Sequence, residues 1–167
     1  MEFDEKIHTH LMSVWRESKS FFGIGGKEGM LILTDNHLIF LKRTERMKKW
    51  WGAASKRQIV TLLQNKNTMT DKLDGYEEKD LKIDLEEVKE KYISKITFDN
   101  ILEIDAEEKT WGSILKMEAI ENGKKKNYEF SIVQDWVKYP IKDPTKYLIV
   151  DWKPCVEFVK SRQRVTK

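Results

Sequence analysis

The most regular hydrophobic pattern in the chain lies at residues 27–42, where two apolar runs flank a short polar segment. The apolar runs are Met30 to Leu33 and Leu38 to Leu41, and Asp35-Asn36 lies in the middle of the polar segment. Asp and Asn tolerate the positive φ of a two-residue hairpin turn, so the pattern predicts an antiparallel hairpin. Neither run alternates with polar residues, as a strand with one face in water would. We therefore expect both faces of this hairpin to be covered.

The segments before the hairpin predict a helix and then a strand. Residues 3–15 place apolar side chains three or four positions apart, which is typical of an amphipathic helix. These side chains are Phe3, Ile7, Leu11 and Val14. Residues 18–24 read as a strand, and the glycines between positions 23 and 29 follow it. Their spacing fits neither a P-loop nor a dinucleotide fingerprint, and a strand follows them, so they predict a turn between strands.

Residues 43–91 form a charged insertion after the hairpin. Residues 43–66 predict a helix whose apolar side chains lie on one broad face. They are Met47, Trp50, Trp51, Ala54, Ile59, Leu62 and Leu63. Between Lys42 and Arg57 there are seven basic residues and one acidic residue, a net charge of +6. From Asp71 to Glu90 nine acidic residues and four lysines give −5, so the two blocks could neutralise each other. Within the insertion we expect a loop at 67–75 and a short helix at 85–91.

From Tyr92 onward the hydrophobic period becomes two. Residues 92–106 predict one strand, or two strands broken near Asp99-Asn100. Residues 111–119 and 128–132 alternate in the same way, and Asn122-Gly123 between them is a strong hairpin signal.

The end of the chain predicts a closing helix. Prolines interrupt residues 135–150, where Tyr147 to Val150 could be strand or helix. Residues 151–164 then predict a helix capped by Asp151, with Pro154 tolerated in its first turn. Its apolar stripe comprises Trp152, Cys155, Val156 and Val159.

The order of these elements indicates a mainly β fold with added helices. Six or seven antiparallel strands are followed by one amphipathic helix, with a helical insertion after the third strand. Such an order suits two antiparallel sheets or a partly open small barrel of about seven strands, with the C-terminal helix plugging one open end.

The central hairpin resembles a strand pair of GRAM-type and bacterial pleckstrin-homology-like domains. Their pattern G-x-L-x-L-T-x-x-x-L-x-F matches Gly29, Leu31, Leu33, Thr34, Leu38 and Phe40. The later stretch SKITFDNILEID resembles their following strand, and the Asn-Gly hairpin and the closing helix fall in the same order. The likeness covers residues 18–42 and 92–164, and the insertion at 43–91 has no counterpart in it.

This resemblance implies a fold and a binding role, not a particular ligand. The basic lipid-binding motif of the better-known pleckstrin-homology members lies between the first two strands. Here that loop offers Lys27 but no cluster of Lys or Arg.

Composition limits the class of protein. A length of 167 residues favours a single domain spanning 1–167. The net charge of only +3 does not by itself argue for nucleic acid. The sequence has no apolar run near the roughly 20 residues of a membrane span, and its acidic N-terminus does not read as a signal peptide. The single cysteine, Cys155, favours a reducing, cytoplasmic setting, at most peripheral to a membrane.

Catalytic and metal sites are not indicated. His8 and His10 lie two apart, which on a helix points them to different faces, and a third ligand is missing. Cys155 lies on the apolar stripe of the last helix, where a cysteine is usually a small buried hydrophobe. We therefore expect no enzyme, no cofactor and no metal.

The candidate binding surface is the basic, tryptophan-containing start of the insertion. It comprises Lys42, Arg43, Arg46, Lys48, Lys49, Trp50, Trp51, Lys56 and Arg57. Helices that lie in a lipid interface combine Trp with Lys and Arg in this way, so a non-catalytic module that binds a partner protein or an anionic membrane is one interpretation. Alternatively, the Trp face packs over the central hairpin as part of the core.

Two further possibilities remain open for the six tryptophans. The same basic stretch could bind single-stranded nucleic acid by stacking, although the acidic block counts against this. Trp15, Trp111 and Trp152 lie on predicted apolar faces, where packing is the expected role, and Trp136 is not assigned.

Overall fold

The computed structural model describes residues 5–18, 26–45, 47–69, 78–89, 92–137 and 143–163, leaving aside the side chains at 50, 78, 137 and 143. Its strands are β1 (Ile7–Ser18), β2 (Gly26–Thr34), β3 (His37–Lys42), β4 (Ile93–Thr97), β5 (Ile101–Lys109), β6 (Gly112–Glu121), β7 (Lys124–Val137) and β8 (Asp143–Tyr147). Its helices are α1 (Lys48–Gln64), α2 (Glu78–Glu87), the 3₁₀ turn η2 (Phe98–Asn100) and α3 (Lys153–Arg162). The expected mainly β class with a C-terminal helix is thus confirmed, although the strands form a single sheet rather than two.

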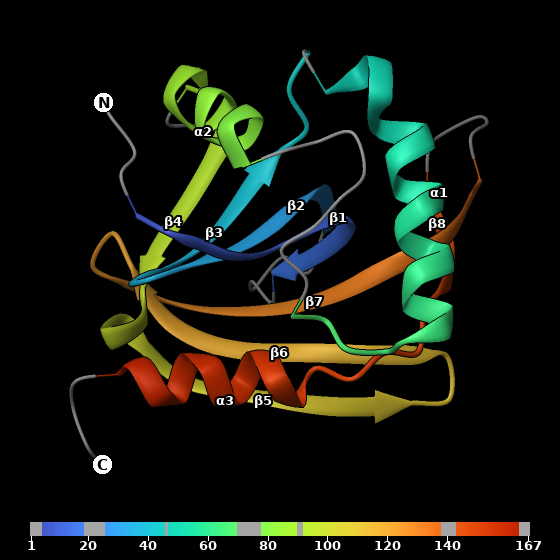
Figure 1. The fold of residues 1–167 in the computed structure, drawn as a ribbon. Helices are drawn as coiled ribbons and strands as arrows, with labels where there is room; N and C mark the ends of the chain where they lie inside the picture. The colour runs from blue at the N-terminus through green and yellow to red at the C-terminus, as the bar shows by residue number, and fades with distance from the viewer. Residues whose placement is uncertain are drawn as a thin grey trace.

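The sheet is antiparallel and strongly curled. Its strands run in the order β4-β3-β2-β1-β7-β6-β5, and β8 pairs with β7. The three residues of η2 connect the two end strands, β4 and β5, although these do not pair with each other among the described residues. The two ends of the sheet therefore lie close together, and the β1–β4 half crosses over the β5–β7 half (Figure 1).

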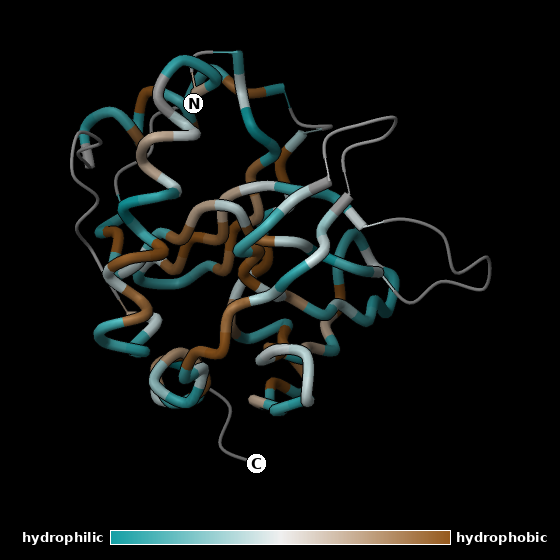
Figure 2. The backbone as a smooth tube through the Cα atoms, turned by 90° about the vertical axis from the view of Figure 1, so that its right-hand side faces the viewer, coloured by the Kyte–Doolittle hydropathy of each residue, from teal (hydrophilic) through white to brown (hydrophobic). Residues whose placement is uncertain are grey.

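The central hairpin is covered on both faces, as expected. One face contributes Leu31, Leu33, Leu38 and Phe40 to the larger core cluster, which lies inside the curled sheet. The other contributes Met30, Ile32, Ile39 and Leu41 to a second cluster with residues of α1 and α2. Hydrophobic positions accordingly gather on the interior strands (Figure 2). The helical insertion covers the outer face of the sheet.

The β2–β3 turn is held by side chains rather than by positive φ. Among the described non-glycine residues only Ser13 and Asn122 have positive φ, so Asp35 and Asn36 do not adopt the expected backbone. Instead the Thr34 hydroxyl accepts the His37 amide at 2.9 Å, and Glu5 accepts the Asn36 amide at 2.9 Å. At the β6–β7 turn, in contrast, Asn122 (φ 52°) and Gly123 (φ 76°) confirm the predicted hairpin.

The predicted N-terminal helix at 3–15 is wrong: its described part forms β1. This strand pairs with β2 on one side and β7 on the other. Register shifts between Ile7 and Thr9 and between Leu11 and Val14 interrupt its alternation, so its apolar residues acquire a helix-like spacing. Most of the predicted strand at 18–24 lies outside the described residues, and Ser18 is the last residue of β1.

The C-terminal helix confirms the predicted closure of the fold. α3 buries Cys155, Val156 and Val159 in the larger core cluster, and it packs against β5 and η2. The Asp151 carboxylate accepts the Lys153 amide at 3.0 Å, and Pro154 lies in the first turn. One end of the curled sheet is therefore covered by a helix.

The remaining differences concern element boundaries. α2 begins at Glu78, earlier than the helix expected at 85–91, and most of the predicted loop at 67–75 lies outside the described residues. The predicted break near residues 99–100 is confirmed as η2. Of the 135–150 segment, residues 135–137 end β7 and residues 143–147 form β8, after which the chain continues irregularly to Val150. None of the described helices is long and apolar enough to cross a membrane.

Candidate functional site

A hollow of about 850 Å³ opens where strands β2 and β3 meet the insertion. Of the predicted binding residues, Lys42, Arg43 and Lys48 line it. Lys49, Lys56 and Arg57 are exposed on α1 and do not line the hollow. Arg46 and the side chain of Trp50 lie outside the described part of the chain. The predicted surface is therefore divided between this hollow and the outer face of α1.

Trp51 is part of the core and not of a binding surface. Its side chain is only 4% exposed and belongs to the cluster beneath the insertion. The indole Nε1 donates to Glu28 Oε2 at 3.2 Å, and the Arg43 guanidinium lies 5.9 Å from the centre of the ring. For this residue the packing interpretation is correct, because an indole buried in this way cannot stack on a nucleotide base.

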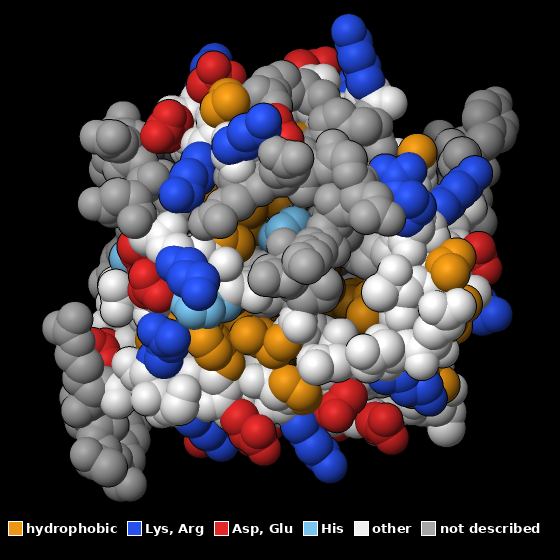
Figure 3. Space-filling view, in the orientation of Figure 1, with side chains coloured by type: hydrophobic (Ala, Val, Ile, Leu, Met, Phe, Trp, Pro, Cys, Tyr) orange, Lys and Arg blue, Asp and Glu red, His pale blue; other side chains and the backbone are white. Residues whose placement is uncertain are grey.

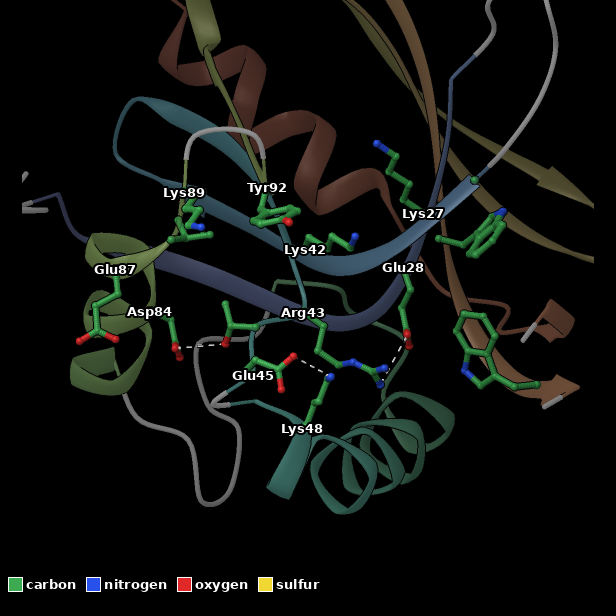
Figure 4. A pocket seen from close by; sticks show the side chains of 15 residues that line it. Lys27, Glu28, Lys42, Arg43, Glu45, Lys48, Asp84, Glu87, Lys89 and Tyr92 are labelled. Carbon is green, nitrogen blue, oxygen red and sulfur yellow. Dashed lines mark hydrogen bonds and ion pairs between the residues drawn. The ribbon is translucent and has the colours of Figure 1, made fainter. Parts of the chain in front are cut away.

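The hollow has a basic side and an acidic side. Its lining residues come from several strands and both insertion helices: Trp15, Gly26, Lys27, Glu28, Lys42, Arg43, Thr44, Glu45, Lys48, Asp84, Glu87, Val88, Lys89, Tyr92 and Trp136. Lys89, Lys42 and Lys27 lie along one side in the view of Figure 4, with Tyr92 among them. Asp84, Glu45 and Glu28 lie along the opposite side (Figure 4).

Three of the carboxylates already have partners within the protein. Glu28 accepts the Trp51 indole and lies 3.8 Å from Arg43 Nη1. Glu45 pairs with Lys48 at 2.8 Å, and the buried Asp84 accepts the Thr44 hydroxyl at 3.4 Å. Arg43 and Lys48 are thus neutralised locally, and they contribute little net charge to the hollow.

Three other cations form a row across neighbouring strands, which we call the cationic row. Arg16 of β1 lies directly opposite Lys27 of β2, and Gly29 of β2 lies opposite Lys42 of β3. Lys27 and Gly29 are two residues apart and therefore share a face, so Arg16, Lys27 and Lys42 all project from the inner face of the sheet. Within the described residues none of the three forms an ion pair. Adjacent like charges repel, and a bound anion would relieve this repulsion.

Arg16 is held rigidly at one end of the row. Its guanidinium carbon lies 4.6 Å from the ring centres of both Phe40 and Tyr128. Burial lowers the pKa of Arg16, but the ordinary pKa of a guanidinium is so high that the group remains charged at neutral pH. Stacking on aromatic faces leaves the N–H edge available for a carboxylate or a phosphate.

The Glu121 carboxylate lies near enough to Arg16 to oppose the effect of burial on the pKa of the guanidinium. Glu121 accepts the hydroxyl groups of both Tyr128 and Ser94. Burial, together with the bond to Glu121, raises the pKa of Tyr128 to about 12, so the phenol is neutral. Lys42, at the other end of the row, lies 5.0 Å from the Tyr92 ring centre. Cations and aromatic rings therefore alternate along this edge.

The described residues offer no evident catalytic chemistry at the hollow. No group of three His, Cys, Asp or Glu residues among them could hold a metal ion. Burial raises the pKa of the Cys155 thiol to about 12, so it is not a nucleophile at neutral pH. His8 pairs with Asp35 at 2.8 Å and His37 with Glu5 at 2.7 Å, both beside the β2–β3 turn. The arrangement is suited to binding an anion.

The binding surface predicted from the sequence does not include Arg16, Lys27 or Lys89. Arg16 follows directly on the segment read as a helix, and Lys27 was noted only as an isolated cation. A usable signal was present, because Arg16 and Lys27 flank a connection between two strands and must therefore lie near each other if those strands pair.

No protein-family model matches this chain, and no curated protein sequence matches it either. The assignment of function therefore depends on the geometry of the hollow and its neighbourhood.

Proposed function

We propose that this protein is a non-catalytic binding module on a pleckstrin-homology-like scaffold, and that its hollow receives an acidic segment of a partner protein. The scaffold proposal is supported by the curled seven-strand path and by α3, which packs against β5 and η2. It is further supported by the stretch from Gly29 to Phe40, which carries the resemblance and forms the β2–β3 hairpin.

The cationic row carries the binding proposal. Arg16, Lys27 and Lys42 come from three adjacent strands and have no ion-pair partner among the described residues. A hydrogen bond to a charged group contributes about 1.5–3 kcal/mol. Lys27 and Lys42 line the hollow, so a carboxylate bound there would meet two such donors and would reduce the repulsion along the row.

The opposite side of the hollow favours a protein segment over a phosphate-rich lipid headgroup. Glu87 lines the hollow together with the lysines and forms no ion pair among the described residues, whereas Glu45 is paired with Lys48 and Asp84 is buried. A polyanionic headgroup of matching size would bring its phosphates close to these carboxylates. A peptide can place acidic side chains on the basic side and neutral or basic groups on the acidic side.

Nucleic acid is less well supported. Trp51 is buried, and the acidic side of the hollow would repel a phosphate backbone. The free, buried thiol of Cys155 is compatible with a reducing compartment, which we include in the proposal.

An array of short acidic peptides, probed with the intact protein, tests the proposal. We expect acidic sequences to be retained in preference to basic or scrambled-charge versions, with binding that weakens as salt increases. Lys27→Gln with Lys42→Gln should weaken retention about tenfold or more, since each lost charged hydrogen bond removes over 1 kcal/mol. The matched control is Lys49→Gln with Lys56→Gln, which removes the same charge from the outer face of α1.

The outcome can contradict the proposal in two ways. Retention that is unchanged in the Lys27/Lys42 variant would place the binding elsewhere. The second contrary outcome is that the protein binds vesicles carrying phosphorylated inositol lipids, or a random single-stranded oligonucleotide, more strongly than any peptide. If that binding also depends on Lys27 and Lys42, the lipid or the oligonucleotide and not a protein segment occupies the hollow.

A further inference from the structure

Large hydrophobic side chains are exposed mainly on one side of the molecule, away from the hollow. Among the described residues, four side chains of this kind are about half exposed: Val60 (56%), Leu63 (57%), Trp111 (50%) and Ile149 (49%). Two others, Ile83 and Tyr92, are less exposed and belong to α2 and to the edge of the hollow. Trp111 lies in the β5–β6 turn and not on a strand face as predicted, and of the expected core or rim packing it has the rim position.

A ring contact and the local burial pattern place Trp111, Tyr147 and Ile149 on one surface. The Trp111 ring lies 5.2 Å from the Tyr147 ring, and Ile149 points outward between the buried Leu148 and Val150. Two residues later, Asp151 forms a parallel bridge with Asn67, and its backbone N–H donates to the backbone carbonyl of Lys66 at 2.8 Å.

The bridge brings the end of α1 beside Ile149. Lys66 and Asn67 come two and three residues after Gln64, the last residue of α1, so the end of the helix that carries Val60 and Leu63 lies near the segment that follows Ile149. Val60 and Leu63 are three residues apart and share one face of the helix. We call Val60, Leu63, Trp111, Tyr147 and Ile149 the apolar strip.

Exposed lysines flank the apolar strip. Lys56 precedes Val60 by one helical turn, and Lys66 and Lys153 lie on either side of the Asn67–Asp151 bridge. The Asp151 carboxylate accepts the Lys153 amide and so is partly engaged. Glu107 and Glu108 also lie beside Lys66 and Lys153, but Glu107 is paired with Lys109 and Lys116. Among the described residues Lys56, Lys66 and Lys153 form no ion pair, so basic charge prevails around the strip. On the side of the molecule occupied by α1, basic and hydrophobic side chains lie next to one another on the surface (Figure 3).

We propose that the apolar strip docks on the surface of an anionic lipid bilayer. Trp and Tyr favour the interface between headgroups and acyl chains, and lysines around an apolar surface are attracted by anionic lipids. A second copy of the strip is a poor occupant, because the flanking lysines would face each other. The charge of the surroundings thus selects an anionic partner, and the exposed Trp–Tyr pair selects a lipid interface.

This docking surface is separate from the hollow. Gly112, next to Trp111, begins β6, and Glu121, beside the cationic row, ends it. At about 3.3 Å per residue the ten residues of β6 span roughly 33 Å. The inference therefore does not depend on the proposed function, and either can fail alone.

Sedimentation with phosphatidylcholine vesicles, with and without phosphatidylserine, tests the inference. We expect the protein to sediment with phosphatidylserine vesicles and to be released by salt. Leu63→Glu and Trp111→Ser should each reduce the bound fraction about tenfold, since each removes an apolar side chain from the lipid contact. The matched control Ile83→Glu introduces the same charge at an exposed position of α2 and should leave binding unchanged, as should Lys27→Gln with Lys42→Gln.

Quenching by brominated phosphatidylcholine in the same vesicles gives a second readout. Trp111→Phe retains an apolar side chain and should still bind, but it should lose most of the quenching seen for the unmodified protein. If Trp111→Ser does not fold, Trp111→Phe still tests whether the Trp111 ring contacts the lipid. Absence of sedimentation, binding without quenching of Trp111, or equal loss of binding in Ile83→Glu would each overturn the inference.

Discussion

Tyr128 shows how a single residue connects the sheet to the cationic row. Its ring stacks on Arg16, its hydroxyl donates to Glu121, and only 6% of it is exposed. Burial and the hydrogen bond to Glu121 raise the pKa of Tyr128 to about 12, from an ordinary value near 10, although the positive charge of Arg16 acts in the opposite direction. The protonated phenol is therefore the form that the folded state stabilises.

This shift predicts a loss of stability in alkali. A group whose pKa is raised by folding contributes its full stabilisation below its unfolded pKa, here about 10, and loses it as the pH rises through the folded value. A pKa shift of two units corresponds to at most about 2.7 kcal/mol of stabilisation of the folded state. The free energy of unfolding, measured with urea between pH 9 and pH 12, should therefore fall in the unmodified protein. Tyr128→Phe should remove this component, and an unchanged pH dependence in that variant would contradict the assignment.

At the scale of elements, α1 acts as a cover for the outer face of the central hairpin. Trp51 is its largest described contribution, because it packs in the cluster of Met30, Ile32 and Leu41 and satisfies Glu28. The same helix presents Val60 and Leu63 outward. One helix thus supplies core packing on one face and part of the apolar strip on the other.

Trp51 is buried and Trp111 is half exposed, so their substitution should lower the free energy of unfolding by different amounts. Trp51→Ala should lower the free energy of unfolding by about 3–5 kcal/mol, as expected for a large buried aromatic side chain. Trp111→Ala should lower it by about 1.5 kcal/mol or less, since this half-exposed ring contributes an edge contact with Tyr147. Urea unfolding followed by circular dichroism measures both. Similar costs for the two variants would mean that the assignment of buried and exposed faces is wrong.

Elements with strong local signals were predictable, and those set by tertiary contacts were not. The Asn122-Gly123 hairpin and the apolar stripe of α3 follow directly from local sequence. β1 was read as a helix because the bulge near Ser13 alters its hydrophobic spacing. The cationic row depends on register, since Arg16, Lys27 and Lys42 are far apart in sequence and become neighbours only when three strands pair.

At the scale of the whole molecule, the two proposed surfaces lie at opposite ends of β6. The cationic row lies at the Glu121 end, and the apolar strip lies at the Gly112 end. A bilayer in contact with the strip would leave the hollow facing solution. The two proposals together predict that the protein holds a partner protein at a membrane surface.

This arrangement predicts that both ligands bind at the same time. Protein bound to phosphatidylserine vesicles should retain an acidic peptide selected from the array, with an affinity within about threefold of that in solution, because surfaces this far apart couple weakly. Lys27→Gln with Lys42→Gln should lose the peptide but stay on the vesicles, whereas Leu63→Glu should keep the peptide and leave the vesicles. Flotation of the vesicles with labelled peptide measures both. Displacement of the peptide by vesicles would contradict independent binding, and displacement that Leu63→Glu does not relieve would show that lipid and peptide compete for the hollow.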